Sequence, residues 1–499
     1  MVLRRMLAAS LAGLILAPLS LAQQTRVGIR GAQFMVNGKV TYSAEQGFPA
    51  AHALIAGTLL NVRAVQAVFE DSQYPGSGSR RNPYATNVMG PVWFDYPDAP
   101  FDPERNLREF LSALPQWRKC GVLAFTINLQ GGGPVDGNYG ENVPMQPHRN
   151  MAFEADGTLR PAYLSRVKRV IERADELGMV VLVGLFYQGQ NARMEELPND
   201  AAIRRGIVEA VRWLKRQPHR NVMIEIQNEV GVRGYKHRLL TPAGAADALI
   251  LARDEAAGEF PVSVSWVGGM RDERALKAAD FILFHTNGRT PEAVHDEIAA
   301  MRRLGGYEKP LLINEDGVST FNLHAAAEEH VGWGFYDQGT NNYMDGFQSP
   351  PVNWGVSSLV KWLFFEQVSK LTGSPVPPRP AFNNPEAPQV TVFGLSDGQI
   401  LTKPVWIEAI VEDRHPRWPI KRVEFFIDAK PYSYRGRAPY LLGNVEFWNP
   451  QQLDAGDHVL RVVAFDMRGP RFSETAAMTE IRFRVAAASA SASASTPAR

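Results

Sequence analysis

The feature that most constrains the fold is a long alternation of apolar runs with amphipathic segments, which begins near Thr58. The nearly continuous apolar runs are typical of parallel strands covered on both faces. Eight alternations over about 315 residues favour an α/β chain folded as a (β/α)₈ TIM barrel over an open doubly wound sheet. The predicted strands are Leu60–Val68, Val122–Asn128, Val180–Tyr187, Val222–Gln227, Val262–Trp266, Phe281–His285, Leu311–Asn314 and a weaker Tyr343–Phe347. The predicted helices are Arg105–Arg118, Pro161–Leu177, Ala201–Arg216, Ala243–Ala257, Pro291–Leu304 and Val356–Leu371.

The segments on either side of this alternation predict further units. Asn37-Gly38, between two apolar runs, is typical of a two-residue hairpin turn, so the barrel unit at 23–373 should begin with a hairpin. Residues 374–387 are rich in proline and should form a stiff linker. Short alternating runs at 388–486 predict an all-β, immunoglobulin-like sandwich, and the Ala/Ser tail at 487–499 should be disordered.

The N-terminus predicts export. Arg4 and Arg5 precede an apolar run, and small residues at Ser20 and Ala22 suit cleavage of a signal peptide covering 1–22. That run is too short for a permanent membrane anchor. We therefore expect a secreted or periplasmic bacterial protein. Cys120 is the single cysteine, so no disulfide forms within the chain, and we expect it to be a small buried residue between a helix and a strand.

Composition excludes some partners. The chain is 45% hydrophobic and 21% charged, and 53 Lys and Arg residues balance 52 Asp and Glu residues. Without a strong net charge we expect no nucleic-acid partner, and a neutral substrate fits the balance. The sequence leaves the oligomeric state open.

Two predicted strands end in glutamate. The fourth leads into Asn228-Glu229, and the seventh leads into Asn314-Glu315. Residues at the carboxyl ends of barrel strands carry the chemistry of this fold, and strands four and seven stand across the barrel mouth from each other. Glycoside hydrolysis needs such a facing carboxyl pair, in which one group protonates the departing oxygen and the other attacks the anomeric carbon or activates water.

The runs Ile226-Gln-Asn-Glu229 and Ile313-Asn-Glu315 resemble the motifs of clan A glycoside hydrolases, the cellulase-like families such as family 5. The resemblance covers about residues 30–372, within the eightfold pattern of strand and helix. It implies a retaining mechanism without metal or cofactor, with Glu229 as acid/base and Glu315 as nucleophile. We expect the pKa of the acid to be raised and the nucleophile to stay ionised.

The resemblance also implies roles for other residues. Asn228 would bind the sugar 2-hydroxyl, Arg63 would hold the nucleophile ionised, and His285 would position it. A tryptophan platform beneath the sugar corresponds to Trp354. Where many relatives carry histidine after strand three, this chain has Phe186-Tyr187-Gln188. The remaining residues predicted to bind substrate are Tyr187, Asn128 and Trp266.

Four alternatives to a glycoside hydrolase can be compared from the sequence. The two glutamates could be structural ion-pair partners. A metal hydrolase is disfavoured because the ten histidines form no His-x-His or His-Glu-x-x-His motif, and a serine hydrolase because no Gly-x-Ser-x-Gly elbow occurs. The main alternative is a secreted carbohydrate-binding protein on the same barrel. The sandwich should be a spacer packed on the barrel, with a glycan-binding face of Trp406, Trp418 and Trp448 as its alternative.

Overall fold

The computed structural model describes most of the chain. Described are residues 25–70, 96–131, 150–188, 190, 197–232, 235–306, 308–337, 346–347, 350–381, 387–414, 419–444, 447–467 and 474–487. The predicted signal peptide, Trp418 and nearly all of the Ala/Ser tail lie outside these ranges. Within the described ranges, no helix combines the length and the apolar character that crossing a membrane requires.

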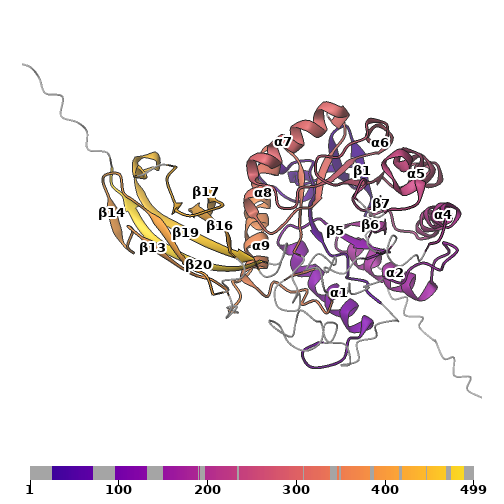
Figure 1. Ribbon diagram of the computed structural model, residues 1–499, viewed down its shortest axis with the longest axis horizontal. Helices are drawn as coiled ribbons and strands as arrows, with labels where there is room; N and C mark the ends of the chain where they lie inside the picture. The colour runs from indigo at the N-terminus through magenta and orange to yellow at the C-terminus, as the bar shows by residue number, and fades with distance from the viewer. Residues whose placement is uncertain are drawn as a thin grey trace, which may run out of the picture.

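A closed parallel barrel forms the centre of the larger unit (Figure 1). Its strands are hydrogen-bonded in the order β8-β7-β6-β5-β4-β12-β11-β10-β9. Because β8 and β9 are two halves of one strand separated at Val264, the sheet meets itself there and the barrel has eight strands, which confirms the predicted fold class. The bounds are β4 (Leu60–Arg63), β5 (Ala124–Asn128), β6 (Val180–Phe186), β7 (Val222–Gln227), β8 (Val262–Ser263), β9 (Ser265–Trp266), β10 (Ile282–His285), β11 (Leu311–Glu315) and β12 (Gly332–Phe335).

The eighth strand corrects the sequence prediction. It is β12, which pairs with β11 and β4, whereas Phe347 and the residue before it are not in a strand, and 343–345 lie outside the described residues. Two glycines interrupt the apolar run of β12 and conceal it in the sequence. They are needed because a Cβ on Gly332 would lie 2.5 Å from the carbonyl oxygen of Leu59, and one on Gly334 equally close to that of Asn314.

Helices surround the barrel (Figure 1). Four of them, α1, α2, α5 and α7, begin with proline, which fits the first helical turn because its missing N–H has no partner there. The six predicted helices are present, while α6 and α8 were not predicted because they are short. The bounds are α1 (Pro103–Lys119), α2 (Pro161–Glu176), α4 (Asp200–Arg216), α5 (Pro242–Ala256), α6 (Glu273–Ala278), α7 (Pro291–Met301), α8 (Thr320–Glu328) and α9 (Leu359–Thr372).

A small N-terminal sheet closes the end of the barrel opposite the carboxyl ends of its strands. It comprises β1 (Val27–Arg30), β2 (Gln33–Val36) and β3 (Lys39–Val40). The predicted Asn37-Gly38 turn is confirmed, with φ of +53° and +75°. The ring of Phe34 packs edge-on against Phe281, 5.8 Å away, just before β10 begins. This end of the barrel is therefore filled by packed side chains.

The C-terminal unit is a sandwich of two sheets, beside α8 and α9 in Figure 1. One sheet has the order β13-β15-β18 and the other β14-β20-β19-β16-β17. Every strand of the two sheets lies within the range 388–486 predicted for this unit. The bounds are β13 (Gln389–Phe393), β14 (Gln399–Leu401), β15 (Glu408–Glu412), β16 (Ile420–Ile427), β17 (Lys430–Arg435), β18 (Tyr440–Leu441), β19 (Gly456–Met467) and β20 (Glu474–Val485).

The sandwich shares a hydrophobic core with the barrel. Phe426 of β16 is fully buried among barrel residues, with its ring edge-on to Phe321 of α8 at 5.3 Å. Arg461 of β19 donates two hydrogen bonds to Glu366 of α9, at 2.5 and 3.1 Å. Helix α9 is buried almost along its whole length because it is covered from both sides. The two units therefore pack as one body, as expected for a spacer fixed to the barrel.

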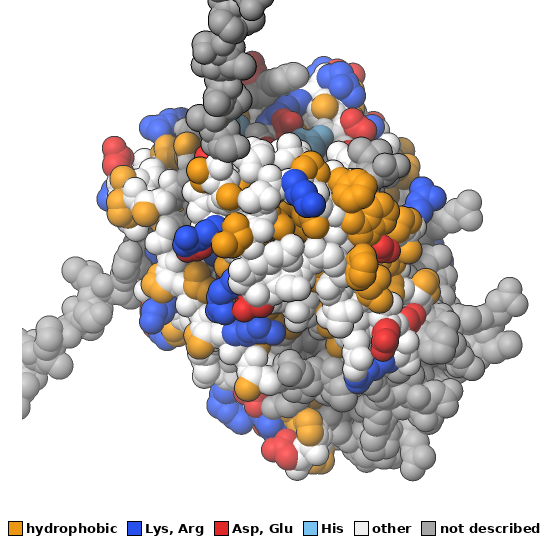
Figure 2. Space-filling model, turned by 90° about the vertical axis from the view of Figure 1, so that its left-hand side faces the viewer, with side chains coloured by type: hydrophobic (Ala, Val, Ile, Leu, Met, Phe, Trp, Pro, Cys, Tyr) orange, Lys and Arg blue, Asp and Glu red, His pale blue; other side chains and the backbone are white. Residues whose placement is uncertain are grey.

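The alternative for the sandwich, a glycan-binding face of three tryptophans, does not fit the two of them that the structure describes. Trp448 is 2% exposed and lies in the sandwich's own core. Trp406 is half-buried beside Phe447, which is 62% exposed, with the ring centroids 6.1 Å apart. Apolar side chains do gather on this end of the molecule, as Figure 2 shows, and Phe393 and Ile410 of the smaller sheet are among the exposed ones.

Candidate active site

A pocket of about 490 Å³ lies at the carboxyl ends of the barrel strands. Its size is ordinary for a site that binds a small molecule or part of a polymer. It brings together five residues predicted from the sequence: Tyr187, Asn228, Glu229, His285 and Glu315. They follow or end β6, β7, β10 and β11, so the strand-end positions chosen from the sequence lie together in one pocket.

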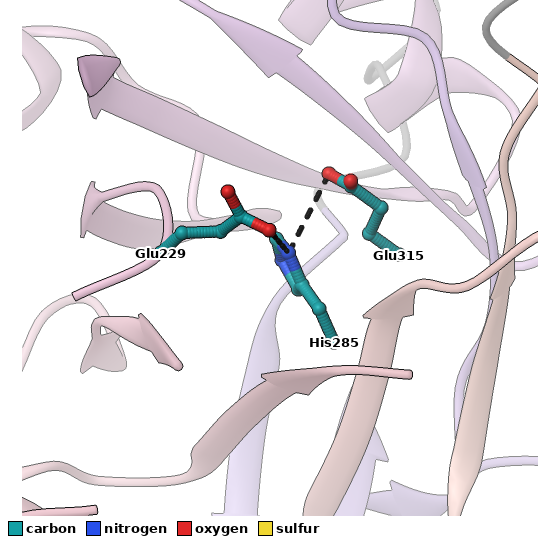
Figure 3. A group of neighbouring side chains, drawn as sticks. All are labelled: Glu229, His285 and Glu315. Atoms are coloured by element: carbon teal, nitrogen blue, oxygen red, sulfur yellow. Dashed lines mark hydrogen bonds and ion pairs between the residues drawn. The ribbon is translucent and has the colours of Figure 1, made fainter. Parts of the chain in front are cut away.

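Glu229 and Glu315 face each other with His285 between them (Figure 3). The Nδ1 atom of His285 lies 3.1 Å from an oxygen of Glu229 and 3.7 Å from one of Glu315. One oxygen of each carboxylate and this nitrogen all lie within 4.8 Å of one another. The side chain of Glu229 is 17% exposed and that of Glu315 is 8% exposed, so both reach the pocket from a largely buried position.

The backbone holds Glu229 in an uncommon conformation. Its φ is +55°, in the left-handed region that a non-glycine residue rarely adopts. The conformation is fixed from both sides: the Glu229 N–H donates to Ser265 Oγ at 2.9 Å, and its carbonyl accepts from Val232 N–H at 3.1 Å. Such strain is commonly found where a side chain must be aimed at a site.

Arg63 lies beneath the pocket and is 2% exposed. Its Nε is 2.5 Å from Glu315 Oε2, its Nη1 is 3.5 Å from Glu225 Oε2, and its Nη2 donates to Asn228 Oδ1. The predicted contact between Arg63 and the carboxylate of strand seven is therefore present. Glu225 is 1% exposed and absent from the pocket lining, so it belongs to the support of the site.

Four further polar residues of the pocket were not predicted from the sequence. Gln188 donates to Glu229 Oε2 at 2.9 Å and accepts from Asn228 Nδ2 at 3.1 Å. Asn287 donates to Glu315 Oε1 at 3.0 Å. Arg289 and Tyr336 complete this group. Gln188 and Asn287 each follow a barrel strand by two residues, so a wider window at the strand ends would have found them, while Tyr336 follows the concealed β12.

Three residues predicted to bind substrate lie away from the pocket. Trp354 is 1% exposed, stacks on Phe347 at 6.0 Å and donates to Asn106 of α1, so it belongs to the core. Trp266 is 1% exposed, and because its strand neighbour Ser265 points to Glu229, it points the other way. Asn128 occupies space left by Gly184, where a Cβ would approach it to 2.2 Å.

The two carboxyl groups have different pKa values. Their order is opposite to the one expected from the sequence, in which Glu229 has the raised pKa. Burial raises the pKa of Glu315, and the negative charge of Glu229 adds to this, although His285 and Arg63 act against it. Burial also works to raise the pKa of Glu229, but His285, Arg63 and Gln188 together outweigh it, so this pKa is lowered. The pKa of His285 is raised, because its two carboxylate neighbours outweigh its burial. The closer contact of His285 with Glu229 contributes to this order.

The same three side chains could in principle hold a metal ion. Zinc bonds to nitrogen and carboxylate oxygen are about 2.0–2.2 Å long, so ligand atoms up to 4.8 Å apart would have to move closer together. Arg63 already places a positive charge 2.5 Å from Glu315 Oε2, and a second cation there would be repelled. The described residues therefore fit a carboxylate pair better than a metal centre.

No family profile and no curated protein sequence matches this chain. Solved structures of glycoside hydrolases are similar to it at low identity. An endo-β-1,4-mannanase from Thermotoga petrophila is 14% identical, over 76% of this chain and 94% of its own, with a TM-score of 0.40. A tri-modular family 5 (subfamily 4) endo-β-1,4-glucanase from Bacillus licheniformis, complexed with cellotetraose, is 13% identical over 86% of this chain and 78% of its own, with a TM-score of 0.36.

The sandwich also has a structural likeness. Fibronectin(III)-like modules of CbhA from Clostridium thermocellum are 20% identical to it, with a TM-score of 0.16. The match covers 20% of this chain and 47% of the chain of those modules. Because the identities and TM-scores are this low, these structures assign neither a residue role nor a substrate to this chain.

Proposed function

We propose that the protein is a glycoside hydrolase that cleaves β-glycosidic bonds of an oligo- or polysaccharide with retention of configuration. The observation that carries the proposal is the facing pair Glu229 and Glu315, with oxygens within 4.8 Å of each other across the pocket. Retaining enzymes hold their carboxyl groups about 5–5.5 Å apart, whereas inverting enzymes need about 6.5–9.5 Å to admit a water molecule. The β-linkage follows from the resemblance of the two strand-end motifs to clan A, and export through residues 1–22 is part of the same proposal.

In the proposed mechanism Glu315 is the nucleophile. Arg63 and Asn287 fix its two oxygens, while the more exposed Glu229 reaches the departing oxygen. A Glu315 oxygen bonds to the anomeric carbon as the glycosidic bond breaks and the proton of Glu229 passes to the leaving group. Glu229 then takes a proton from water, whose oxygen attacks the anomeric carbon and releases Glu315.

One observation favours a second candidate, in which the roles are exchanged. The pKa of Glu229 is lowered and that of Glu315 is raised, which suits Glu229 as the ionised nucleophile. Against the exchanged roles, Arg63 forms an ion pair with Glu315, which favours the ionised form of Glu315. Because the two groups are close, they titrate as a pair, and binding of a substrate can move the shared proton.

The test is release of product from a panel of β-linked polysaccharides and activated aryl β-glycosides. Wild type is compared with Glu229→Ala and Glu315→Ala, and the exposed Glu45→Ala serves as control. We expect both pocket variants to lose activity and the control to keep it. With azide present, Glu315→Ala should form an α-glycosyl azide and Glu229→Ala a β-glycosyl azide; the reverse pattern would exchange the roles.

Two other outcomes would contradict the proposal. Inversion at the anomeric carbon, followed by NMR during wild-type turnover, would exclude double displacement. No release from any member of the panel, with binding of the same sugars still measurable by calorimetry, would support a carbohydrate-binding protein.

A further inference from the structure

The pocket is lined by an arginine, Arg289, whose charge the proposed mechanism does not use. Arg289 follows β10 by four residues and lines the pocket together with Asn287, which contacts Glu315. It is half-buried, so it is neither a free surface side chain nor a core residue. Its backbone N–H donates to the Thr286 carbonyl at 2.9 Å and its own carbonyl accepts from Asn322 at 3.1 Å, so its main chain is held on both sides.

The guanidinium group of Arg289 lies at the pocket wall. A Cβ added to Gly268, another lining residue, would come within 2.8 Å of Arg289 Nη2 and 3.4 Å of its Nε. The side chain of Arg289 therefore rests against the bare backbone of Gly268, and the missing side chain at this glycine provides the space that it occupies.

The two arginines of the site differ in their partners. Arg63 contacts Glu315 and Glu225. Across the described part of the chain, no carboxylate comes within the 4.0 Å of an ion pair with Arg289. A half-buried guanidinium that faces a substrate pocket without a carboxylate partner is suited to an anionic group on the ligand, which it can bind through paired N–H donors.

We propose that Arg289 selects glycosides with an anionic substituent, a carboxylate or a sulfate, on a sugar ring bound in this pocket. The inference rests on the proposed function for the reaction and names the substrate class. It differs from the expectation of a neutral substrate. Net charge describes the whole chain, whereas recognition depends on the charge at the pocket, where Arg289 has no carboxylate partner among the described residues.

The test compares substrates matched except for charge. 4-Nitrophenyl β-D-glucuronide is paired with the β-D-glucoside, the corresponding galacto pair follows, and the 6-sulfated β-D-glucoside separates sulfate from carboxylate. β-Linked oligosaccharides with and without a uronate carry the charge on a neighbouring ring. The measured quantity is the ratio of kcat/KM for the anionic member to that for its neutral partner.

We expect a ratio above one in the wild type for at least one pair, and a decrease of about 10- to 100-fold in Arg289→Gln. Arg289→Lys should restore part of the ratio because it keeps the charge. Gly268→Ala should lower the ratio as well, because the added methyl group displaces the guanidinium while the charge remains. Arg204→Gln, at an exposed position outside the pocket, should leave the ratio unchanged.

The outcomes separate this inference from the proposed function. Cleavage of neutral glycosides only, or a ratio that Arg289→Gln leaves unchanged, would overturn the selectivity and keep the hydrolase. If nothing is cleaved, binding of the same charged and neutral oligosaccharides is measured by calorimetry. Binding of the anionic oligosaccharide by the wild type that is lost in Arg289→Gln would support the inference without the reaction. If the wild type does not bind the anionic oligosaccharide, the inference is overturned.

Discussion

The carboxyl group of Asp316, next to Glu315, allows a quantitative test of the electrostatics behind the pocket. Burial raises its pKa to about 6, although hydrogen bonds from Asn322 and Trp333 lower it in part. Its ordinary value is 3.8. As pH rises from about 4 to about 6, the unfolded chain therefore loses this proton while the folded protein keeps it, and the free energy of unfolding falls. A difference of about two pKa units corresponds to about 3 kcal/mol.

We expect Asp316→Asn to remove this loss of stability. The amide keeps an oxygen for the donors of Asn322 and Trp333, both at 2.8 Å, and does not ionise. Relative to wild type, the variant should gain about 3 kcal/mol in its free energy of unfolding between about pH 4 and pH 7. Urea unfolding across this range measures the difference.

A matched control has the opposite sign. The pKa of the exposed Asp156 is lowered because Thr158 hydrogen-bonds its ionised form. The stability that this carboxylate contributes is present at neutral pH and is lost as pH falls, so Asp156→Asn should cost stability at pH 7 and little in acid. A difference for Asp316→Asn that does not change with pH, or that favours the wild type at pH 7, would refute burial as the dominant effect.

Three further predictions concern the site and the contact between the two units. Arg63→Gln should leave two buried carboxylates without their cation, lowering the free energy of unfolding by about 3–5 kcal/mol in urea titrations and moving the acid limb of the kcat/KM profile to higher pH. His285→Gln should raise the pKa of Glu229, so the limb of the pH–rate profile set by Glu229 moves to higher pH; a shift to lower pH would contradict the assigned contact. Phe425 and Phe426 are adjacent and fully buried, and replacing either with alanine should cost about 3–5 kcal/mol of stability. Only Phe426→Ala should lower the denaturation midpoint of the barrel, because Phe426 lies in the core that the two units share and Phe425 in the sandwich's own core. Loss of activity on small substrates reports the denaturation of the barrel.

The fold could be predicted largely from the sequence because each barrel strand is covered on both faces and therefore reads as an apolar run. The exception is β12, where the close approach of neighbouring strands requires glycines that interrupt this pattern. The strands predicted at Val122–Asn128, Val180–Tyr187 and Val222–Gln227 agree with β5, β6 and β7 within two residues at each end.

The candidate site could be predicted in its strand-end members, and the tryptophans assigned to it could not be placed. The end of a strand fixes where a residue lies, which located Glu229, His285 and Glu315. Whether a tryptophan faces the pocket or the core depends on strand direction and on packing between distant helices, so Trp354 and Trp266 were placed wrongly. The order of the two pKa values could not be predicted either, since it depends on burial and on contacts with His285, Arg63 and neighbouring amides that only the folded structure brings together.

The shared core has a consequence for how the protein is made. The barrel is complete in sequence at the end of α9, but the apolar residues of α8 and α9 that contact the sandwich stay uncovered until about 100 more residues have been synthesised, roughly 5 to 20 s at usual rates. During this interval the nascent barrel presents a surface of the kind that aggregates or binds chaperones. A gene shortened to encode the barrel alone would make this condition permanent, so we expect its product to accumulate in inclusion bodies, while synthesis of the sandwich in the same cell should recover soluble barrel.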